Sequence, residues 1–413
     1  MVRIGLVTTE APAHGVHGGI GTFVNDLARG LAKRSHAVTV LARCMTPEPQ
    51  TLEWEGVTYR PIRVRGDRLL SRVGCVMPAL NFAWALARHI HHIEAHEGPF
   101  DLIEVPDYLG AGLFLPAVTK TPLVVRLHGY SRLIRRLNQR APARGQAALE
   151  AMERHTYHQA DVILAQSQAL LDAARNDFNT SRAPSQVVLP GIDADVFRTG
   201  NRGAVRAWLR IPEDAVVLLF VGRLEHRKGV NELVEAWLRL SGAGHSVYLV
   251  LAGAATRDFG CVNRFETLAR QAGCAHLLRL TGFIPHARIH DWYAASDVFV
   301  APSRFEPLGL VYLEAMAASR AIVACASGGV PEILSHLNDS YLIPRVHPEP
   351  LFEALRTLLL YPQLGAALGR AARRKVCEHL SLSAMTERTW LAYEQLFNNP
   401  PARNRTANRP LNQ

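Results

Sequence analysis

Two basic residues, Arg223 and Lys228, lie five positions apart in the segment FVGRLEHRKG (220–229). An apolar, β-branched run comes before them and a helical pattern begins at Val230, so both cations belong to a loop at the end of a strand. Two cations in such a loop could grip a diphosphate from two sides. A solvated basic turn would have the same sequence, so the loop by itself leaves both interpretations open.

Two carboxylates, Glu306 and Glu314, follow in the segment PSRFEPLGLVYLEAMA (302–317). Glu306 is expected in a loop after a strand and Glu314 inside a helix that begins near Leu310. Their spacing is slightly more than two helical turns, so both side chains could face one cleft. An acid in an otherwise apolar helix needs polar partners, and the hydroxyl groups of a ribose or hexose would serve.

Glycine pairs stand at two expected helix starts, Gly18 and Gly19 near the N-terminus and Gly328 and Gly329 in SGGVPE (327–332). Glycine allows the backbone to approach a phosphate closely, and a helix N-terminus supplies free N–H groups. The first turn lacks the GxGxxG spacing, and the following strand ends in a basic residue, which argues against a dinucleotide site. A plain tight turn remains an alternative for this loop.

Strand-like and helix-like segments alternate along the chain, which predicts parallel sheets covered by helices on both faces. One series runs from VRIGLVT to DVILAQS and a second from VVLLFVG to AIVACAS. Pro, Gly and Asp cluster between them in PGIDADVFRTGNRG, which indicates a domain boundary. We predict two doubly wound α/β domains, residues 1–195 and 196–382. A helix over 383–397 would return to the first domain, and a disordered tail would cover 398–413.

The order of these motifs resembles the family 4 glycosyltransferases, which have the GT-B fold. The resemblance spans residues 1–395 and rests on HGGIGTF near the N-terminus, RLHGY (126–130), PGID (190–193), VGRLEHRKG, EPLGLVYLEAMA and GGVPE. It implies two Rossmann-like domains that face each other across a cleft. The second domain would bind a nucleotide-sugar donor and the first would receive the acceptor.

The resemblance also implies a role for each matching residue. Arg223 and Lys228 would hold the donor diphosphate, and Glu306 would contact the transferred hexose. Glu314 would accept hydrogen bonds from the ribose hydroxyls, and His128 in RLHGY would lie beside the reacting sugar. The catalytic set is thus His128, Arg223, Lys228 and Glu306. The remaining donor-binding residues would be Gly18, Gly19, Pro307, Leu308, Gly309 and Leu310, with the amides around Gly19 reaching the distal phosphate or the sugar.

Transfer with retention of configuration follows from the resemblance, through attack on the same face as the departing phosphate. No residue identifies itself as the carboxylate nucleophile of a double displacement. The two cations would neutralise the leaving group, so we predict no metal ion and no cofactor. His92 and His96 have the spacing of a metal pair, but a solvated helix face is the preferred interpretation. Two other interpretations stay open, a nucleotide-sugar epimerase and a non-catalytic nucleotide-sugar-binding protein on the same fold, whereas a dinucleotide-dependent oxidoreductase would need the GxGxxG spacing and an acid after the second strand.

The net charge of +10 suits a protein that meets an anionic partner. No apolar run is long enough to cross a membrane and no signal peptide is evident, so we predict a cytoplasmic enzyme. Two basic segments, with apolar residues interleaved, predict peripheral contact with an anionic membrane surface at its inner face. Their arginines are 126, 132, 135, 136, 140 and 144 in one segment and 60, 63, 65, 68 and 72 in the other. A soluble basic face or an anionic soluble acceptor is the alternative, and no nucleic-acid partner is predicted.

Overall fold

The computed structural model describes residues 1–10, 18–44, 50–64, 66, 70, 74–256 and 262–398. Contacts divide the chain into two units. Unit 1 comprises Met1–Arg136, Arg140–Pro190 and Leu382–Gln413, and unit 2 comprises Leu137–Gln139 and Gly191–Ser381. Of the predicted disordered tail, residues 398–413, Asn398 is instead the last residue of the final helix, and residues 399–413 lie outside the described residues.

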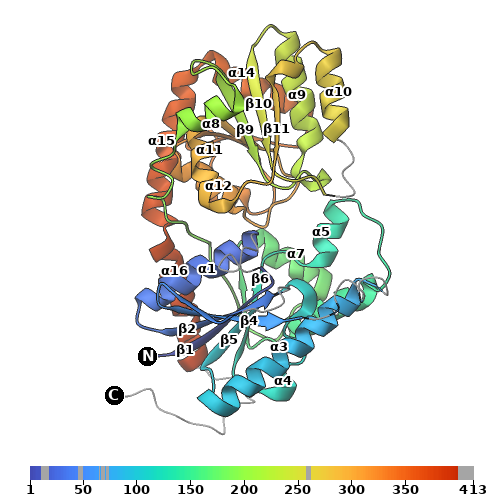
Figure 1. Cartoon of the computed structure of the whole chain (residues 1–413), viewed down its shortest axis with the longest axis vertical. Helices are drawn as coiled ribbons and strands as arrows, with labels where there is room; N and C mark the ends of the chain where they lie inside the picture. The colour runs from blue at the N-terminus through green and yellow to red at the C-terminus, as the bar shows by residue number, and fades with distance from the viewer. Residues whose placement is uncertain are drawn as a thin grey trace. The chain divides into compact units, whose positions relative to one another are not determined.

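Unit 1 is built on an eight-stranded sheet in the order β3-β4-β2-β1-β5-β6-β7-β8 (Figure 1). Its neighbouring strands run parallel except for the β3–β4 hairpin. The strands are β1 (Arg3–Thr8), β2 (Ala37–Cys44), β3 (Leu52–Trp54), β4 (Val57–Arg63), β5 (Leu102–Pro106), β6 (Leu123–Leu127), β7 (Val162–Ala165) and β8 (Ser185–Val187). The central strands β5, β6 and β7 are buried throughout, as expected of a sheet covered on both faces.

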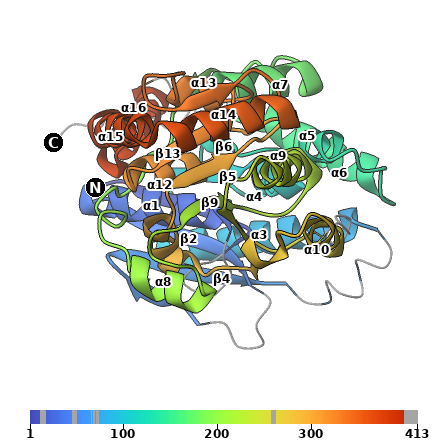
Figure 2. The same cartoon turned by 90° about the horizontal axis from the view of Figure 1, so that it is seen from above.

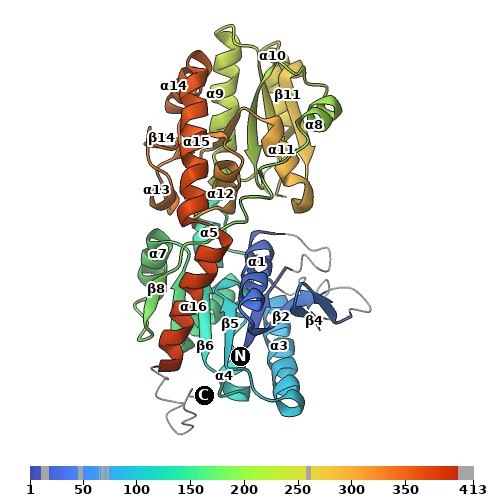
Figure 3. The ribbon, with the colours of Figure 1, turned by 90° about the vertical axis from the view of Figure 1, so that its left-hand side faces the viewer.

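The helices of unit 1 include the last helix of the chain, α16 (Leu382–Asn398), which packs beside α1 (Gly19–Lys33) (Figure 3). A buried ion pair fastens it: Arg126 on β6 donates to Glu104 on β5, with Nε to Oε1 at 2.7 Å. The Tyr393 hydroxyl of α16 donates to the same carboxylate at 2.7 Å. The other helices are α3 (Val76–Glu97), α4 (Leu115–Val118), α5 (Ser131–Leu137), α6 (Gln146–Gln159) and α7 (Gln168–Phe178).

Unit 2 contains a six-stranded, fully parallel sheet in the order β11-β10-β9-β12-β13-β14. The strands are β9 (Val216–Val221), β10 (Val247–Ala252), β11 (Leu278–Gly282), β12 (Val298–Ala301), β13 (Ala321–Cys325) and β14 (Tyr341–Ile343). Counted within the unit, this order is 3-2-1-4-5-6, the arrangement of a dinucleotide-binding Rossmann sheet. The prediction of two doubly wound parallel sheets is therefore confirmed.

Helices cover the sheet of unit 2, and Figure 2 shows α9 and α14, which pack against each other. Trp237 of α9 is fully buried and donates its indole N–H to the Val247 carbonyl oxygen at 2.8 Å. This contact ties the helix to the start of β10. The helices are α8 (Arg202–Leu209), α9 (Val230–Gly242), α10 (Val262–Gln271), α11 (Ile289–Ala295), α12 (Leu310–Ala317), α13 (Val330–Ile333), α14 (Pro348–Leu360) and α15 (Pro362–His379).

Candidate active site

Two loops of unit 2 leave the sheet where its strand order reverses. β9 is the first strand of the unit and β12 the fourth, yet they are neighbours in the sheet. The loop after β9 carries Arg223 and Lys228, and the loop after β12 carries Glu306. Open α/β sheets bind ligands at the carboxyl ends of strands at such a switch point. The topology thus joins two motifs that are 78 positions apart in the sequence.

Glu306 is buried and serves as the common partner of two cations. Lys228 Nζ lies 2.6 Å from Glu306 Oε2, and Arg227 Nη1 donates to the same oxygen at 3.1 Å. Arg227 also donates to the Phe305 carbonyl oxygen at 3.0 Å and, through Nη2, to Glu225 at 2.9 Å. The two loops are therefore fastened to each other by a buried network of alternating charges.

Charge and burial act in opposite directions on this carboxylate. Burial alone would raise the pKa of Glu306, but the charges of Lys228 and Arg227 outweigh it and hold the pKa at about 2. Burial lowers the pKa of Lys228, and Glu306 restores it only in part. Glu306 is thus ionised at neutral pH, and its charge keeps the buried ammonium group in place.

Glycines allow other parts of the backbone to approach Glu306. Gly309 has φ +90°, and a Cβ there would lie 2.7 Å from Glu306 Cγ. A Cβ on Gly328 would lie 2.3 Å from the Glu306 carbonyl oxygen. The Gly329 N–H donates to that oxygen at 2.9 Å, which corrects the prediction that this amide is free for a ligand. Both glycines of SGGVPE therefore shape the Glu306 loop.

Arg223 differs from Lys228 because 61% of its side chain is exposed. Its nearest acid is Glu225, with Nη2 at 3.7 Å from Oε1. Glu225 is buried and also pairs with Arg227, so both arginines of this loop contact the same carboxylate. The sequence prediction missed Glu225 and Arg227. The alternation of charge in RLEHRKG is the signal that could have found them.

The other predicted donor-binding residues follow Glu306 directly. Pro307 and Leu308 are buried, and Gly309 precedes the first residue of α12, Leu310, which is partly exposed. Glu314 lies one helix turn further on and is buried. Its partners within the described residues are Tyr293 and His286, both missed by the sequence prediction.

In unit 1, the glycine turn at the start of α1 already faces an acid. The Gly21 N–H donates to Glu10 Oε2 at 2.9 Å. A Cβ on Gly18 would lie 2.1 Å from the Glu10 carboxylate, whereas Gly19 faces open space. The Glu10 carboxylate therefore contacts the glycine turn at which the sequence predicts a phosphate. This interaction matches the preference of helix N-termini for negative charge.

His128 lies at the carboxyl end of β6, between residues that follow the neighbouring strands. Its Nδ1 is 2.6 Å from the Gln166 amide nitrogen, after β7. The backbone N–H groups of His128 and Gly129 donate to Asp107, after β5, at 3.0 Å each. Burial, with the charge of Arg126, lowers the pKa of His128 to about 3. Burial raises the pKa of Asp107 to about 7. His128 is therefore a neutral hydrogen-bonding group at physiological pH.

Several arginines of the two basic segments form ion pairs with acids from other parts of unit 1. Arg126 is buried against Glu104, Arg135 pairs with Glu150, and Arg132 and Arg136 lie near Asp177. Arg60 pairs with Glu97 in the other segment, while Arg65, Arg68 and Arg72 lie outside the described residues.

Neither a metal cluster nor a membrane-spanning helix is found in the part of the chain that the structure describes. His92 and His96 have rings in contact, with centroids 4.2 Å apart, and His96 Nδ1 is 2.8 Å from the His92 carbonyl oxygen.

Both halves of the chain match known protein families. Residues 201–375 match the model described as glycosyl transferases group 1, and residues 17–196 match glycosyltransferase family 4. A D-inositol 3-phosphate glycosyltransferase of Kineococcus radiotolerans is 30% identical over 385 residues, covering 88% of this chain and 87% of that protein.

Two solved structures show the same fold over 96% of this chain and 100% of theirs. Sucrose-phosphate synthase from Thermosynechococcus elongatus has a TM-score of 0.81 at 22% identity. Anabaena HepE in complex with UDP-glucose has a TM-score of 0.72 at 18% identity.

Proposed function

Because the chain belongs to the group 1 glycosyltransferases of family 4, with the GT-B fold, we propose that it moves a hexosyl unit from a nucleotide sugar to an acceptor with retention of configuration. The main support from the structure is the linked pair of loops in unit 2. Lys228 Nζ lies 2.6 Å from Glu306, and the exposed Arg223 projects from the same loop as Lys228.

In this proposal, Arg223 and Lys228 neutralise the diphosphate as the bond to the sugar breaks. Such stabilisation is most effective when the charges are fixed before the reaction begins. Glu306, which Arg227 also contacts, holds Lys228 in a buried position, so little reorganisation is needed. Two protein cations then supply the charge that a divalent ion would otherwise supply. Glu306 also contacts the hexose in this assignment, and His128 serves as a neutral hydrogen-bonding group.

The relatives indicate which substrates to test first. HepE was solved with UDP-glucose, so a UDP-hexose is the first donor, with a GDP-hexose as the alternative. The Kineococcus relative is named for D-inositol 3-phosphate, so a phosphorylated cyclitol is the first acceptor. Thermal stabilisation by UDP compared with GDP would identify the base. A ligand at a hundred times its Kd raises the unfolding free energy by about 2.7 kcal/mol.

Peripheral contact with an anionic membrane at its cytoplasmic face is part of the proposal. Arg132 and Arg136 are two of the exposed cations that support it, with 46% and 58% of their side chains exposed. Asp177 reduces their net charge, so the expected attraction is weaker than the sequence suggested. Wild-type protein should co-sediment with anionic but not zwitterionic liposomes, and salt should weaken binding. Arg132→Ser with Arg136→Ser should reduce sedimentation. Absence of binding at low salt would exclude membrane contact.

The decisive test of the function is a mass-spectrometric transfer assay over a panel of donors and acceptors. Arg223→Ala should lower kcat/KM by about 100-fold or more, because one of the two cations assigned to the diphosphate is lost. Arg223 is exposed, so this change should leave the fold intact. Lys228→Ala should have a similar effect but needs a check of thermal unfolding.

Arg239→Ala, which removes an exposed arginine of α9, is the matched control and should stay fully active. Normal turnover of Arg223→Ala would refute the diphosphate assignment. Nucleotide-sugar binding with no transfer to any acceptor would instead favour a non-catalytic binding protein.

A further inference from the structure

Glu314 is a buried acid in α12 whose two carboxylate oxygens have different partners. The Tyr293 hydroxyl donates to Oε2 at 2.8 Å. His286 Nε2 lies 3.2 Å from Oε1. Tyr293 is fully buried, whereas 40% of the His286 side chain is exposed. One oxygen is therefore held from inside the protein, and the other faces a residue at the surface.

The Tyr293 hydroxyl has two acceptors, the Glu314 oxygen at 2.8 Å and the Val311 carbonyl oxygen at 3.2 Å, and the carboxylate is the nearer one. Burial and the nearby charge of Glu314 raise the pKa of this hydroxyl well above the usual value, so it stays protonated at physiological pH. The Tyr293 ring packs between Phe197 and Phe299, with centroid distances of 5.9 and 5.5 Å. Close packing restricts the ring to one orientation.

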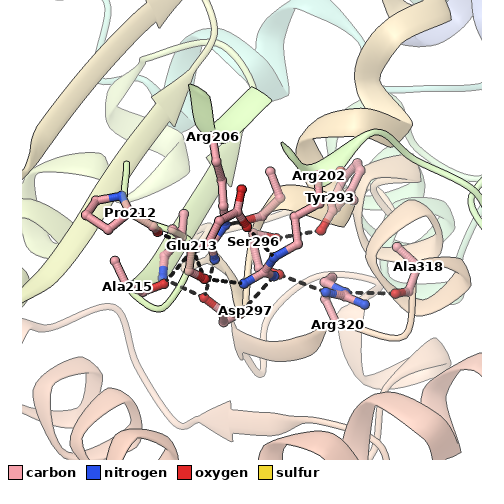
Figure 4. Close-up of polar contacts among 12 residues, drawn as sticks. Arg202, Arg206, Pro212, Glu213, Ala215, Tyr293, Ser296, Asp297, Ala318 and Arg320 are labelled. Carbon is pink, nitrogen blue, oxygen red and sulfur yellow. Dashed lines mark hydrogen bonds and ion pairs between the residues drawn. The ribbon is translucent and has the colours of Figure 1, made fainter. Parts of the chain in front are cut away.

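The end of α11 that carries Tyr293 is fixed by two arginines (Figure 4). Arg206 of α8 donates through Nε to the Ala295 carbonyl oxygen at 3.0 Å and through Nη2 to Asp297 at 3.0 Å. Arg320 donates to the Ser296 carbonyl oxygen at 2.8 Å. These bonds tie the last turn of α11 to two other elements of unit 2. Tyr293 thus projects from a rigid support.

We propose that Tyr293 is the positioning residue for Glu314, holding Oε2 so that Oε1 is presented to the ribose hydroxyls of the bound nucleotide. The inference rests on the proposed function, because it takes Glu314 as the group that contacts the ribose. A carboxylate fixed at one oxygen loses little rotational freedom on binding, so its hydrogen bonds favour the ligand more strongly. When a ribose binds, His286 then either keeps its contact with Oε1 beside the ribose hydroxyl or is replaced there by that hydroxyl.

Loss of the Tyr293 hydroxyl should weaken recognition of the ribose hydroxyls and leave the other contacts to the nucleotide in place. The probe is UDP or GDP, whichever stabilises the wild-type protein more, together with its 2′-deoxy and 3′-deoxy forms. Calorimetry gives the ratio of the Kd of each deoxy form to that of the ribonucleotide. Tyr293→Phe should lower this ratio by about three- to tenfold, the effect of one hydrogen bond.

Tyr312→Phe is the matched control. Tyr312 is also fully buried, lies on α12 itself, and donates to the Ala301 carbonyl oxygen at 2.7 Å. Its loss removes a buried hydroxyl of the same kind away from Glu314, so the ratio should not change. Equal weakening of all nucleotides by Tyr293→Phe, with an unchanged ratio, would show a purely structural role and overturn the inference.

Two further outcomes separate the inference from the proposed function. If the wild-type protein binds the ribonucleotide and both deoxy forms equally well, Glu314 does not recognise the ribose hydroxyls. The inference then fails, while the proposed function stands. A wild-type protein that binds no nucleoside diphosphate contradicts the proposed function itself.

Discussion

Replacement of Glu306 by Gln removes the charge that two buried cations share, and its effect on stability can be worked out from the structure. The pKa of Glu306 falls from a reference value of 4.5 to about 2 in the folded protein. At about 1.4 kcal/mol for each pKa unit, the ionised carboxylate contributes about 3 kcal/mol to the unfolding free energy at pH 7. Glu306→Gln should lose this amount, because Gln resembles the protonated acid in shape and charge.

The pH dependence of the unfolding free energy follows from the same difference in pKa. A carboxyl whose pKa is lowered by folding stabilises the protein above its unfolded pKa, and this stabilisation is lost as pH falls toward the folded pKa. The difference between wild type and Glu306→Gln should therefore shrink from about 3 kcal/mol at pH 7 to about 1.5 kcal/mol at pH 3.

Urea unfolding at several pH values gives the required free energies. Circular dichroism follows the unfolding of both units, and the transition that shifts in Glu306→Gln belongs to unit 2, which contains this residue. Glu232→Gln is the control, since Glu232 pairs with Arg304 in a partly exposed position and should contribute about 1 kcal/mol or less. A deficit below about 1 kcal/mol for Glu306→Gln at pH 7, or an equal deficit at pH 3 and pH 7, would refute the reasoning.

Three further predictions concern other parts of the molecule. Chelation by EDTA should leave the transfer rate nearly unchanged, since Arg223 and Lys228 supply the positive charge; loss of activity that Mg²⁺ or Mn²⁺ restores would contradict this. Arg206→Leu should lower the unfolding free energy by about 1–3 kcal/mol, because the fully buried guanidinium donates to the buried Ala295 carbonyl oxygen, which would lose this donor, and is one of two arginines that pair with Asp297. Arg202→Leu removes a more exposed partner of Asp297 and should lower the unfolding free energy far less. Thermal unfolding of both variants measures the two losses, and equal losses would contradict the reasoning from burial. Glu314→Ala should weaken binding of the bare nucleoside diphosphate in calorimetry, and unchanged affinity would argue against ribose contact.

The sequence by itself determined the class of fold, because the signals for it are local. Apolar runs of strand length alternate with helical periodicity, and glycines mark the loops between them. It also determined which loops carry charge, since Arg223, Lys228 and Glu306 follow β9 and β12 directly. The order of the motifs was enough to indicate the family, which the comparisons confirm. Each of these signals is carried by residues that are close together in the sequence, and the motifs need only be read in order, so no knowledge of the packing is needed.

Only the tertiary structure decided how the charges are paired. Arg227 and Glu306 are 79 positions apart, and the alternating charges of RLEHRKG do not indicate that Arg227 pairs with Glu306. Tyr293 resembles any other aromatic residue of a short helix until α12 is packed beside α11. The contact of Glu10 with the glycine turn of α1 and the pairing of the exposed arginines with acids likewise could not be predicted from the sequence. A buried charge must find a partner in space, and the strand order, which no local pattern encodes, determines which residues come within reach.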